Sequence, residues 1–321
     1  MKEQYTYAVA RVRAAENSLL SMKDLEQVLS AKDEKEAFLM LQDKGFSGSG
    51  SYKNVETLLF EENEKTINFI SELKIDKKEF SIFYIQDDYH NLKAALKCVH
   101  SGFRDKVFVP EKNVSLDVIL TAVKERKFDI LPENMQRVAE EALDVLLKTG
   151  DGQKADMIID KAALLEIKAL GEKSDNDLIK EYAKLFVSLS DIKIAARSAI
   201  MNKSYEFIKA AVIDTEDVNT DQLCRAASDG YDELLSYLSS TKFEKAADAL
   251  RQSFSQFEKW CDNSVMSLIK TQKANPFTIG PVAAYFLARD IEIKAVRIVL
   301  SGVINKLDIN SVKERLRDLY V

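Results

Sequence analysis

The side chains best placed to do chemistry in this sequence are acids and bases that recur at regular spacing. Each acid is followed five or six positions later by a base, in stretches whose apolar residues are spaced as in helices. Charges on a mostly apolar helix need partners, because desolvating an unpaired charge is costly. We interpret the recurring set as a structural motif in which the base of each copy pairs with its acid. No residue is singled out as catalytic or as binding a partner. The motif comprises Asp88, Asn91 and Lys93, then Asp191 and Arg197, and finally Glu292 and Arg297.

Two pairs of acids have a spacing of four residues, which places both carboxylates on one face of a helix. Asp156 and Asp160 form the first pair, and Glu258 and Asp262 the second, 102 residues further on (258 − 156). Paired carboxylates can act as general acid and base. A feature copied with each domain more often serves packing, so we expect these acids to pair with Lys and Arg residues of the long helices. Catalysis by the pairs is the alternative.

Metal and thiol chemistry find little support in the sequence. His90 and His100 lie ten residues apart, too far along a helix to share a metal ion, and no Cys-x-x-Cys or His-x-x-x-His spacing occurs. Cys98, Cys224 and Cys261 are widely spaced and odd in number, which indicates reduced, buried thiols. A catalytic Cys–His pair stays open, because such partners meet only in the fold. We predict neither a metal nor a cofactor.

The glycine- and serine-rich stretch from Gly45 to Ser51 could be a phosphate-binding loop or a connector. A phosphate-binding loop ends in Gly-Lys-Ser or Gly-Lys-Thr and follows a strand. This stretch has no such ending, and no strand pattern precedes it. We therefore interpret it as a connector between helices.

Composition favours an all-α protein. Only 10 glycines and 4 prolines occur in 321 residues, too few for a β protein with many turns. The net charge of −6 argues against nucleic-acid binding, which needs a concentrated basic face. No apolar run reaches the roughly 18 residues that would span a bilayer, and the start lacks the features of a signal peptide. We therefore expect a cytoplasmic location.

Helical spacing of apolar residues continues through most of the chain, without the alternation typical of strands. Pro281 suits the first turn of the most apolar helix, and Gly302 is predicted to end that helix in the left-handed conformation. Ser21 and Asp24 have the pattern of a capping box, and Ser311 is expected to cap the last helix. Single helices are expected over 55–74, 79–101, 114–126, 132–148, 153–170, 175–201 and 243–272.

A period of about one hundred residues runs through the chain. The recurring acids are 103 and 101 residues apart (191 − 88 and 292 − 191), whereas the expected helix ends Gly102, Asn202 and Gly302 recur at steps of 100. Solenoid repeats are shorter, at about 20–50 residues, so this period indicates duplicated domains. The two registers differ by up to three residues, so the period is a better guide than any single pairing. The predicted domains are 1–105, 106–213 and 214–321.

Residues at both ends of the chain resemble the C subunit of prokaryotic V/A-type rotary ATPases, whose eukaryotic equivalent is the d subunit. The likeness covers the whole chain and is strongest near the C-terminus. It departs from the family's pattern at Ile194 and Ala295, where the family usually has Asn. The similar stretches are Tyr5-x-Tyr7-Ala-Val-Ala-Arg11, Asp88-x-x-Asn91-Leu92-Lys93, Pro276-Phe277, Gly280-Pro281, Glu292-Ile293, Val296-Arg297-Ile298 and Leu319-Tyr320-Val321.

The resemblance implies a funnel of three pseudo-equivalent helical domains. Such a protein sits on the cytoplasmic end of the proteolipid rotor ring, accepts the tip of the central shaft made of the D and F subunits, and transmits torque without binding nucleotide. It would be peripheral to the membrane, with the ring and the shaft as partners. A free-standing helical adaptor and an enzyme with a dispersed site are the alternatives. Proton and sodium transport, and pumping and synthesis, are not distinguished.

Overall fold

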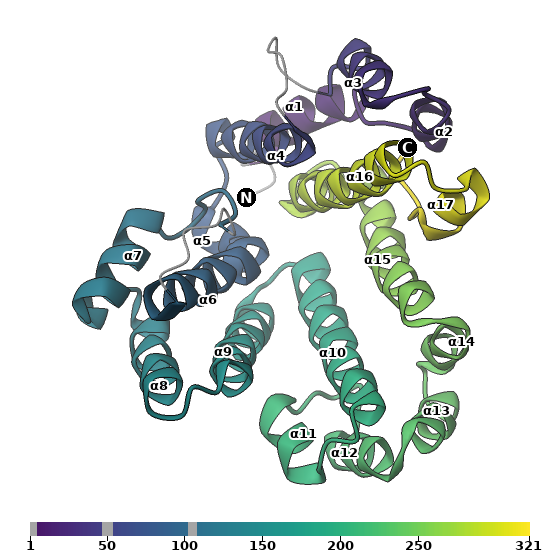
Figure 1. The fold of residues 1–321 in the computed structure, drawn as a ribbon. Helices are drawn as coiled ribbons and strands as arrows, with labels where there is room; N and C mark the ends of the chain where they lie inside the picture. The colour runs from purple at the N-terminus through teal and green to yellow at the C-terminus, as the bar shows by residue number, and fades with distance from the viewer. Residues whose placement is uncertain (1–4, 47–53, 102–107) are drawn as a thin grey trace. The chain divides into compact units, whose positions relative to one another are not determined.

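Helices form the whole of the fold that the structure describes. The computed structural model describes residues 5–46, 54–101 and 108–321, and no strand occurs within these ranges (Figure 1). The all-α prediction is confirmed. The chain packs as two compact units, one made of residues 1–76 and 245–321 and the other of residues 77–244.

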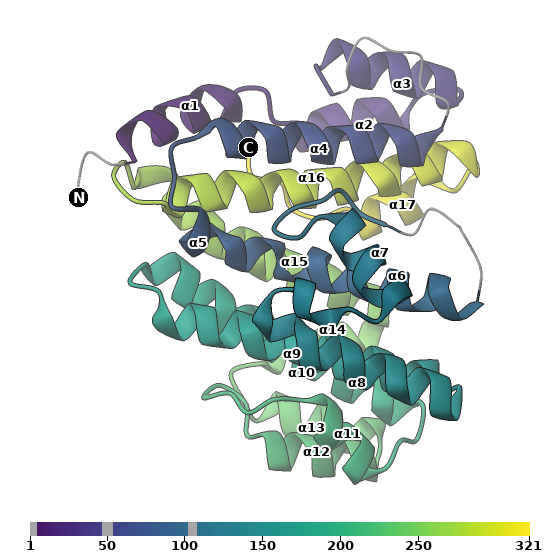
Figure 2. The same cartoon turned by 90° about the vertical axis from the view of Figure 1, so that its left-hand side faces the viewer.

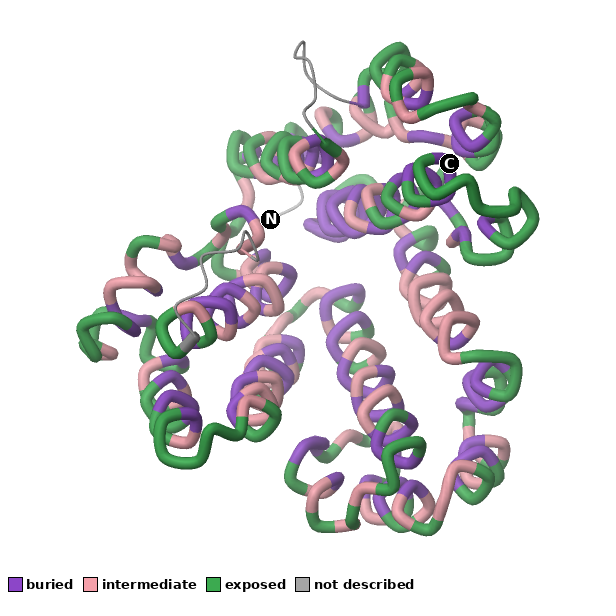
Figure 3. Tube along the Cα trace, in the orientation of Figure 1, coloured by how far each residue is buried: buried purple, intermediate pink, exposed green. Residues whose placement is uncertain are grey.

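The first unit combines the two ends of the chain around one long helix. That helix, α16, has 18 of its 25 residues buried, so it is enclosed on most sides (Figure 3). Figures 1 and 2 both show α4 lying along it. The helices of this unit are α1 Thr6–Glu16, α2 Met22–Leu29, α3 Glu34–Asp43, α4 Val55–Glu72, α14 Glu244–Gln252, α15 Phe254–Lys270, η3 Thr271–Ala274, α16 Gly280–Ile304 and α17 Ile309–Arg315.

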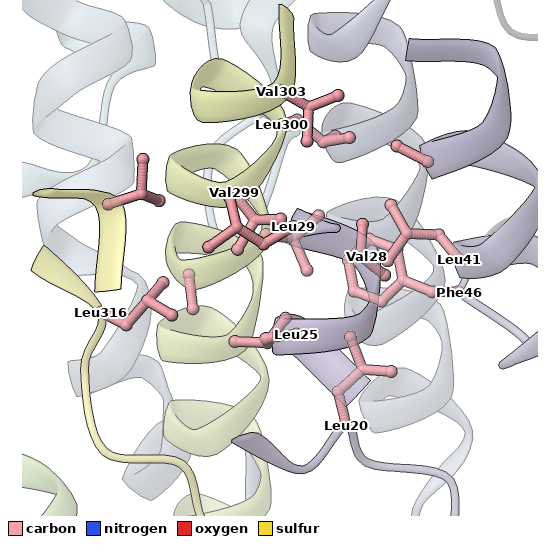
Figure 4. Packing of buried hydrophobic residues seen from close by; sticks show 14 of the residues in the cluster. Leu20, Leu25, Val28, Leu29, Leu41, Phe46, Val299, Leu300, Val303 and Leu316 are labelled. Atoms are coloured by element: carbon pink, nitrogen blue, oxygen red, sulfur yellow. The ribbon is translucent and has the colours of Figure 1, made fainter. Parts of the chain in front are cut away.

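The apolar core of the first unit joins residues that are far apart in the sequence. Side chains of α2, α3 and α4 meet those of α16 and α17 in one cluster (Figure 4). Leu25, Leu41 and Leu300 are fully buried there. Each buried leucine stabilises the fold by about 1.5–3 kcal/mol relative to exposure. The N-terminal helices therefore complete the core of the last long helix. Labelled in Figure 4 are Leu20, Leu25, Val28, Leu29, Leu41, Phe46, Val299, Leu300, Val303 and Leu316.

The second unit is built around the long helices α6, α9 and α10. Helix α9 packs against α6, α8 and α10, and α10 packs in turn against α11, α12 and α13. The crossing of α9 and α10 is close, because a Cβ atom on Gly171 would lie 2.2 Å from the Cβ of Ala183. The helices of this unit are α5 Lys77–Phe80, η1 Ser81–Tyr84, α6 Ile85–Ser101, α7 Leu116–Glu125, η2 Phe128–Ile130, α8 Glu133–Thr149, α9 Gly152–Lys173, α10 Asp177–Ile200, α11 Tyr205–Ala211, α12 Thr220–Asp229 and α13 Tyr231–Ser239.

Several local predictions about helix ends are confirmed. Ser21 and Asp24 form the capping box at the start of α2, with both reciprocal hydrogen bonds present. Pro281 lies in the first turn of α16. Asn202, just beyond α10, has a positive φ of 50°, as expected of a left-handed helix end. Gly102 and residues 47–53 lie outside the described residues, so most of the connector predicted from Gly45 is not tested.

Three expected helix boundaries are wrong. The helix expected over 243–272 is two helices, because Ser253 is extended (φ −172°, ψ 161°) and its side chain caps α15 by accepting from the Gln256 amide. The cap of α17 is Asp308, and Ser311 donates its amide to it at 2.9 Å. The stretch 79–101 is divided among α5, η1 and α6.

Gly302 does not end its helix, contrary to the prediction. Helix α16 continues to Ile304, and Lys306 is the residue with positive φ, at 50°. The glycine instead allows close packing, because a Cβ there would lie 2.7 Å from Cγ2 of Val312 on α17. The two registers still differ when Lys306 is taken as the helix end. The left-handed residue follows the acid by 11 positions after α10 (202 − 191) and by 14 after α16 (306 − 292), which is about one turn more.

The division into three domains stays a prediction. The two packing units do not coincide with 1–105, 106–213 and 214–321, because the first unit contains both ends of the chain. Packing units and sequence repeats are different properties, and a repeat can be completed by residues from elsewhere in the chain.

The close crossing at Gly171 gives a test of the second unit. We expect Gly171→Ala to lower the free energy of unfolding by about 1–3 kcal/mol, because the added methyl would overlap the Ala183 side chain. Gly152→Ala is the matched control on the same helix, since nothing lies within 4 Å of its Cβ position. That change should leave stability unchanged or raise it by up to about 1 kcal/mol. Urea unfolding of the full chain measures both, and equal stability of the two variants would contradict the packing.

Candidate functional site

The three recurring acids occupy the same kind of place in the structure. Asp88 lies on α6, Asp191 on α10 and Glu292 on α16, and their exposed fractions are 2%, 1% and 2%. Buried acids need hydrogen-bond donors or cations to offset the lost hydration. The hydrogen-bond donors of the three acids therefore define the candidate site.

Asp88 holds the chain that leads into α7. It accepts from the backbone amides of Asn113 and Val114 at 3.3 Å each and from the Asn113 side-chain amide at 2.8 Å. Val114 immediately precedes Ser115, the residue before the first turn of α7. Burial raises the pKa of Asp88 to about 6, although these hydrogen bonds oppose the shift.

Asn91, one turn further along α6, fastens the same segment a second time. Its side-chain amide donates to the Val109 carbonyl at 3.1 Å and its side-chain oxygen accepts from the Val109 amide at 2.9 Å. This pairing satisfies both backbone groups of Val109. The corresponding Ile194 and Ala295 have no polar side chain, so the second fastening belongs to the first copy alone.

Asp191 holds the chain that leads into α12. Its Oδ1 accepts from the Ile213 amide at 3.2 Å. Its Oδ2 is buried and has no hydrogen-bond partner among the described residues. Burial raises the pKa of Asp191 to about 7.

Glu292 holds the chain that leads into α2, at the other end of the sequence. It accepts from the Leu20 amide, and Leu20 immediately precedes the α2 cap Ser21. It is also paired with Arg289, one turn earlier on α16. Burial raises the pKa of Glu292, and the Arg289 guanidinium partly offsets that rise.

Arg289 is a buried base at the centre of the Glu292 site. It pairs with Glu62 of α4 as well as with Glu292, and Nε donates to Thr66 Oγ1 at 3.3 Å. Its guanidinium lies over the Phe46 ring, 5.2 Å from the centroid. Two buried acids thus share one buried base, and Lys65 reaches Glu62 from the exposed side at 3.3 Å.

The expected pairing of each acid with the base of its own copy is wrong. Lys93 bonds to Asp160 at 2.5 Å, and Arg297 is half-exposed and pairs with Glu56. Arg197 is exposed, whereas Asp191 is buried and has the Ile213 amide as its donor. A step of five or six residues places acid and base on different sides of a helix, so the base reaches out while the acid faces in.

The paired acids behave as the packing interpretation expected. Asp160 and Asp156 of α9 bond to Lys93 and Lys97 of α6, at 2.5 and 2.7 Å. In the first unit Asp262 of α15 bonds to Arg317 at 2.9 Å. The first two ion pairs join neighbouring helices, whereas Arg317 lies beyond the end of α17, and Lys294 of α16 is 3.9 Å from Asp262. The side chains involved are partly exposed, so each pair contributes little to stability.

The candidate histidines and cysteines lie apart from the acids' hydrogen bonds. On α6, His90 is half-buried and His100 exposed. All three cysteines are free thiols, with Cys224 buried and the other two half-buried. No cluster of three or more metal-ligating side chains was found among the described residues.

The acids' arrangement can tie helices together but presents little surface to a substrate. Each of these carboxylates is at most 2% exposed and accepts from at least one backbone amide, and Asp88 also lines a pocket beside Tyr89 and Asn113. The sequence did not predict the role of Arg289 or its pairing with Glu62. Arg289 is one of the charges on the most apolar helix. The two residues are 227 positions apart, and nothing in the spacing connects them.

Comparison with known proteins agrees with this architecture. The ATP synthase (C/AC39) subunit family matches residues 8–315. The chain belongs to this family. It is 22% identical to the C subunit of the V-type sodium ATPase of Enterococcus hirae, over 96% of this chain and 97% of that protein. It is 20% identical to the C subunit of the A-type ATP synthase of Methanocaldococcus jannaschii, over 99% of this chain and 86% of that protein. The family predicted from the sequence, that of the V/A-type ATPase C subunits, is thus confirmed.

The buried Arg289 gives a stability prediction for this member of the family. Arg289→Ala should lower the free energy of unfolding by about 3–5 kcal/mol, because it leaves Glu62 and Glu292 buried without their base. Arg297→Ala, the matched control on the same helix, should cost less than about 1 kcal/mol, since its pair is exposed.

The loss in Arg289→Ala should also depend on pH. Without the guanidinium, nothing of that charge opposes the effect of burial on the pKa of Glu292, so this carboxyl binds a proton more readily in the folded state than in the unfolded state. The loss therefore shrinks as the pH falls from 8 to 5. Denaturant unfolding of both variants at the two pH values measures this. Equal losses for Arg289→Ala and Arg297→Ala would contradict the buried network.

Proposed function

We propose that this chain is the non-catalytic connector of a V/A-type rotary ATPase, joining the central shaft of D and F subunits to the proteolipid rotor ring. In this role it transmits torque for ATP-coupled transport of protons or sodium. The observation that carries the proposal is the family match over residues 8–315, together with relatives that are named as the C subunits of such enzymes.

The buried ties support a mechanical role. A connector under torque must keep its helices in register, and each recurring acid holds a connection between helices through at least one backbone amide. Such bonds lie away from solvent, so salt screens them far less than exposed pairs. Close-packed helices also transmit strain with little compliance.

The chain's own chemistry fits a part without catalysis. The recurring acids are engaged with backbone donors, and we propose that the chain binds neither nucleotide nor cofactor. No helix of the described residues is long and apolar enough to cross a membrane. Attachment at the cytoplasmic side would then come through the rotor ring. A helical adaptor unrelated to rotary motors is the competing function, and co-purification of the shaft and the proteolipid ring with this chain separates the two.

The proposed function predicts that removing this chain separates two activities that are normally coupled. The catalytic head should still hydrolyse ATP, because its active sites lie on other chains. Transport of ions by the ring should stop, because torque has no path between shaft and ring. The measurement is ATP-driven ion uptake into vesicles whose motor lacks this chain, beside the ATPase activity of the same preparation.

Adding the purified chain back is the control, and it should restore uptake. Uptake that persists at normal coupling without the chain would rule out a connector. Loss of hydrolysis in the isolated head would indicate a catalytic or regulatory role instead.

A further inference from the structure

The segment 210–214, which we term the strap, comprises the last two residues of α11 and the first part of the connection to α12 in the second unit. Val212 and Ile213 are 2% and 4% exposed, so the strap is anchored by apolar side chains. Asp191 of α10 accepts from the Ile213 amide at 3.2 Å. The strap is therefore the counterpart of the segments that Asp88 and Glu292 hold.

Two lysines of α9 hold the strap from its other side. Lys161 donates to the Ala210 carbonyl at 2.7 Å, and Lys168 donates to the Asp214 carbonyl at 2.8 Å. Both ammonium groups thus bind backbone oxygens of the strap, and neither forms an ion pair with Asp191. Among the described residues, the Ile213 amide is the one hydrogen-bond donor to the Asp191 carboxylate.

Asp191 is the least compensated of the three recurring acids. Asp88 has three N–H donors, and Glu292 has an amide and the Arg289 guanidinium. Asp191 has a single donor, and its buried Oδ2 has no hydrogen-bond partner among the described residues. A buried charge with so few donors is costly, so the closed strap favours the protonated carboxyl.

The charged and titratable groups near Asp191 come from α9, the strap and α12. The lysines of α9 favour the ionised carboxylate, whereas Asp214 of the strap opposes it. The buried thiol of Cys224 on α12 is also close enough to interact with Asp191. Helix α13 buries only leucines. The groups that interact with Asp191 are Lys161, Lys168, Asp214 and Cys224. Two further charged groups, Lys209 and Asp221, interact with Cys224.

We propose that Asp191 and the strap form a pH-dependent latch, which is closed most firmly when Asp191 is protonated and loosens when it ionises. A protonated carboxyl keeps its carbonyl oxygen as an acceptor for the Ile213 amide, so closure does not need the charge. Burial raises the pKa of Asp191 to about 7, which places the change near neutral pH.

The sign of the effect follows from linkage. When the strap opens, water reaches Asp191 and its pKa returns toward the ordinary value of about 4. The closed strap therefore binds the proton more tightly than the open strap. Between about pH 4 and 7 the opening equilibrium should rise by up to about tenfold per pH unit, and above that range it should level off.

Hydrogen exchange of the Val212 and Ile213 amides in the full chain tests the latch. After correction for the intrinsic exchange rate, protection should fall by several-fold to about tenfold from pH 6 to 7 and become constant above about pH 8. Protection that is independent of pH, or that rises with pH, would overturn the proposal.

Asp191→Asn supplies the decisive variant, because the amide keeps an acceptor for Ile213 and can never ionise. Its strap should show constant protection across the same range, at or above the wild-type value at pH 8. Glu181→Gln, an exposed change on the same helix, should retain the wild-type profile. A pH dependence that survives in Asp191→Asn would refute the assignment.

A second measurement on the wild-type chain needs no variant. Carboxyl carbon NMR of Asp191 should give a midpoint well above 4, within about a unit of 7. An ordinary midpoint near 4 would overturn the latch, even if Asp191→Asn failed to fold.

Discussion

The structure depends on buried carboxylates that accept hydrogen bonds from backbone amides in the connections between helices. Where the chain passes from one helix to the next, some backbone amides have no hydrogen-bond partner within either helix. Burying those amides unpaired would cost more than the bond itself gains. Asp88 supplies the acceptor from the first turn of α6, and Asp191 and Glu292 supply it from the middle of α10 and α16. The acid therefore sets where the connecting segment lies, and the core forms around that contact.

The three copies offset the cost of the buried charge in different ways. At Asp88 the charge is spread over three N–H donors, and Asn91 fixes a further residue of the same segment. At Glu292 a base is buried with the acid, and it draws Glu62 of α4 into the network. At Asp191 a single amide remains. The three copies of the motif thus share an architecture, in which each acid loses its hydration to a similar extent. The donors and bases that offset this loss differ, so the three acids differ in their sensitivity to pH.

The sequence alone was sufficient to predict features that depend on contacts within one helix. The capping box of Ser21 and the buried character of α16 follow from spacing within one helix. Partners of the acids could not be predicted, because the Asn113 and Leu20 amides come from other parts of the chain and any residue type offers an amide. Gly302 was misjudged for the same reason, since its role depends on Val312 of another helix. The proposed function comes from the family resemblance. The recurring acids by themselves would have indicated only a role in helix packing.

The last tie uses the beginning of the chain to complete the end of it. Glu292 of α16 holds the Leu20 amide, whereas Asp88 and Asp191 hold segments only about 22–26 residues further along the same direction of the chain. The same distance beyond Glu292 would reach residues 314–318, at the end of α17, but Glu292 accepts from the Leu20 amide instead. The N-terminal segment takes that place, and the apolar cluster of α2, α3 and α4 on α16 stabilises it there. All three recurring acids are thereby engaged with a backbone amide, which fits the connector that we propose.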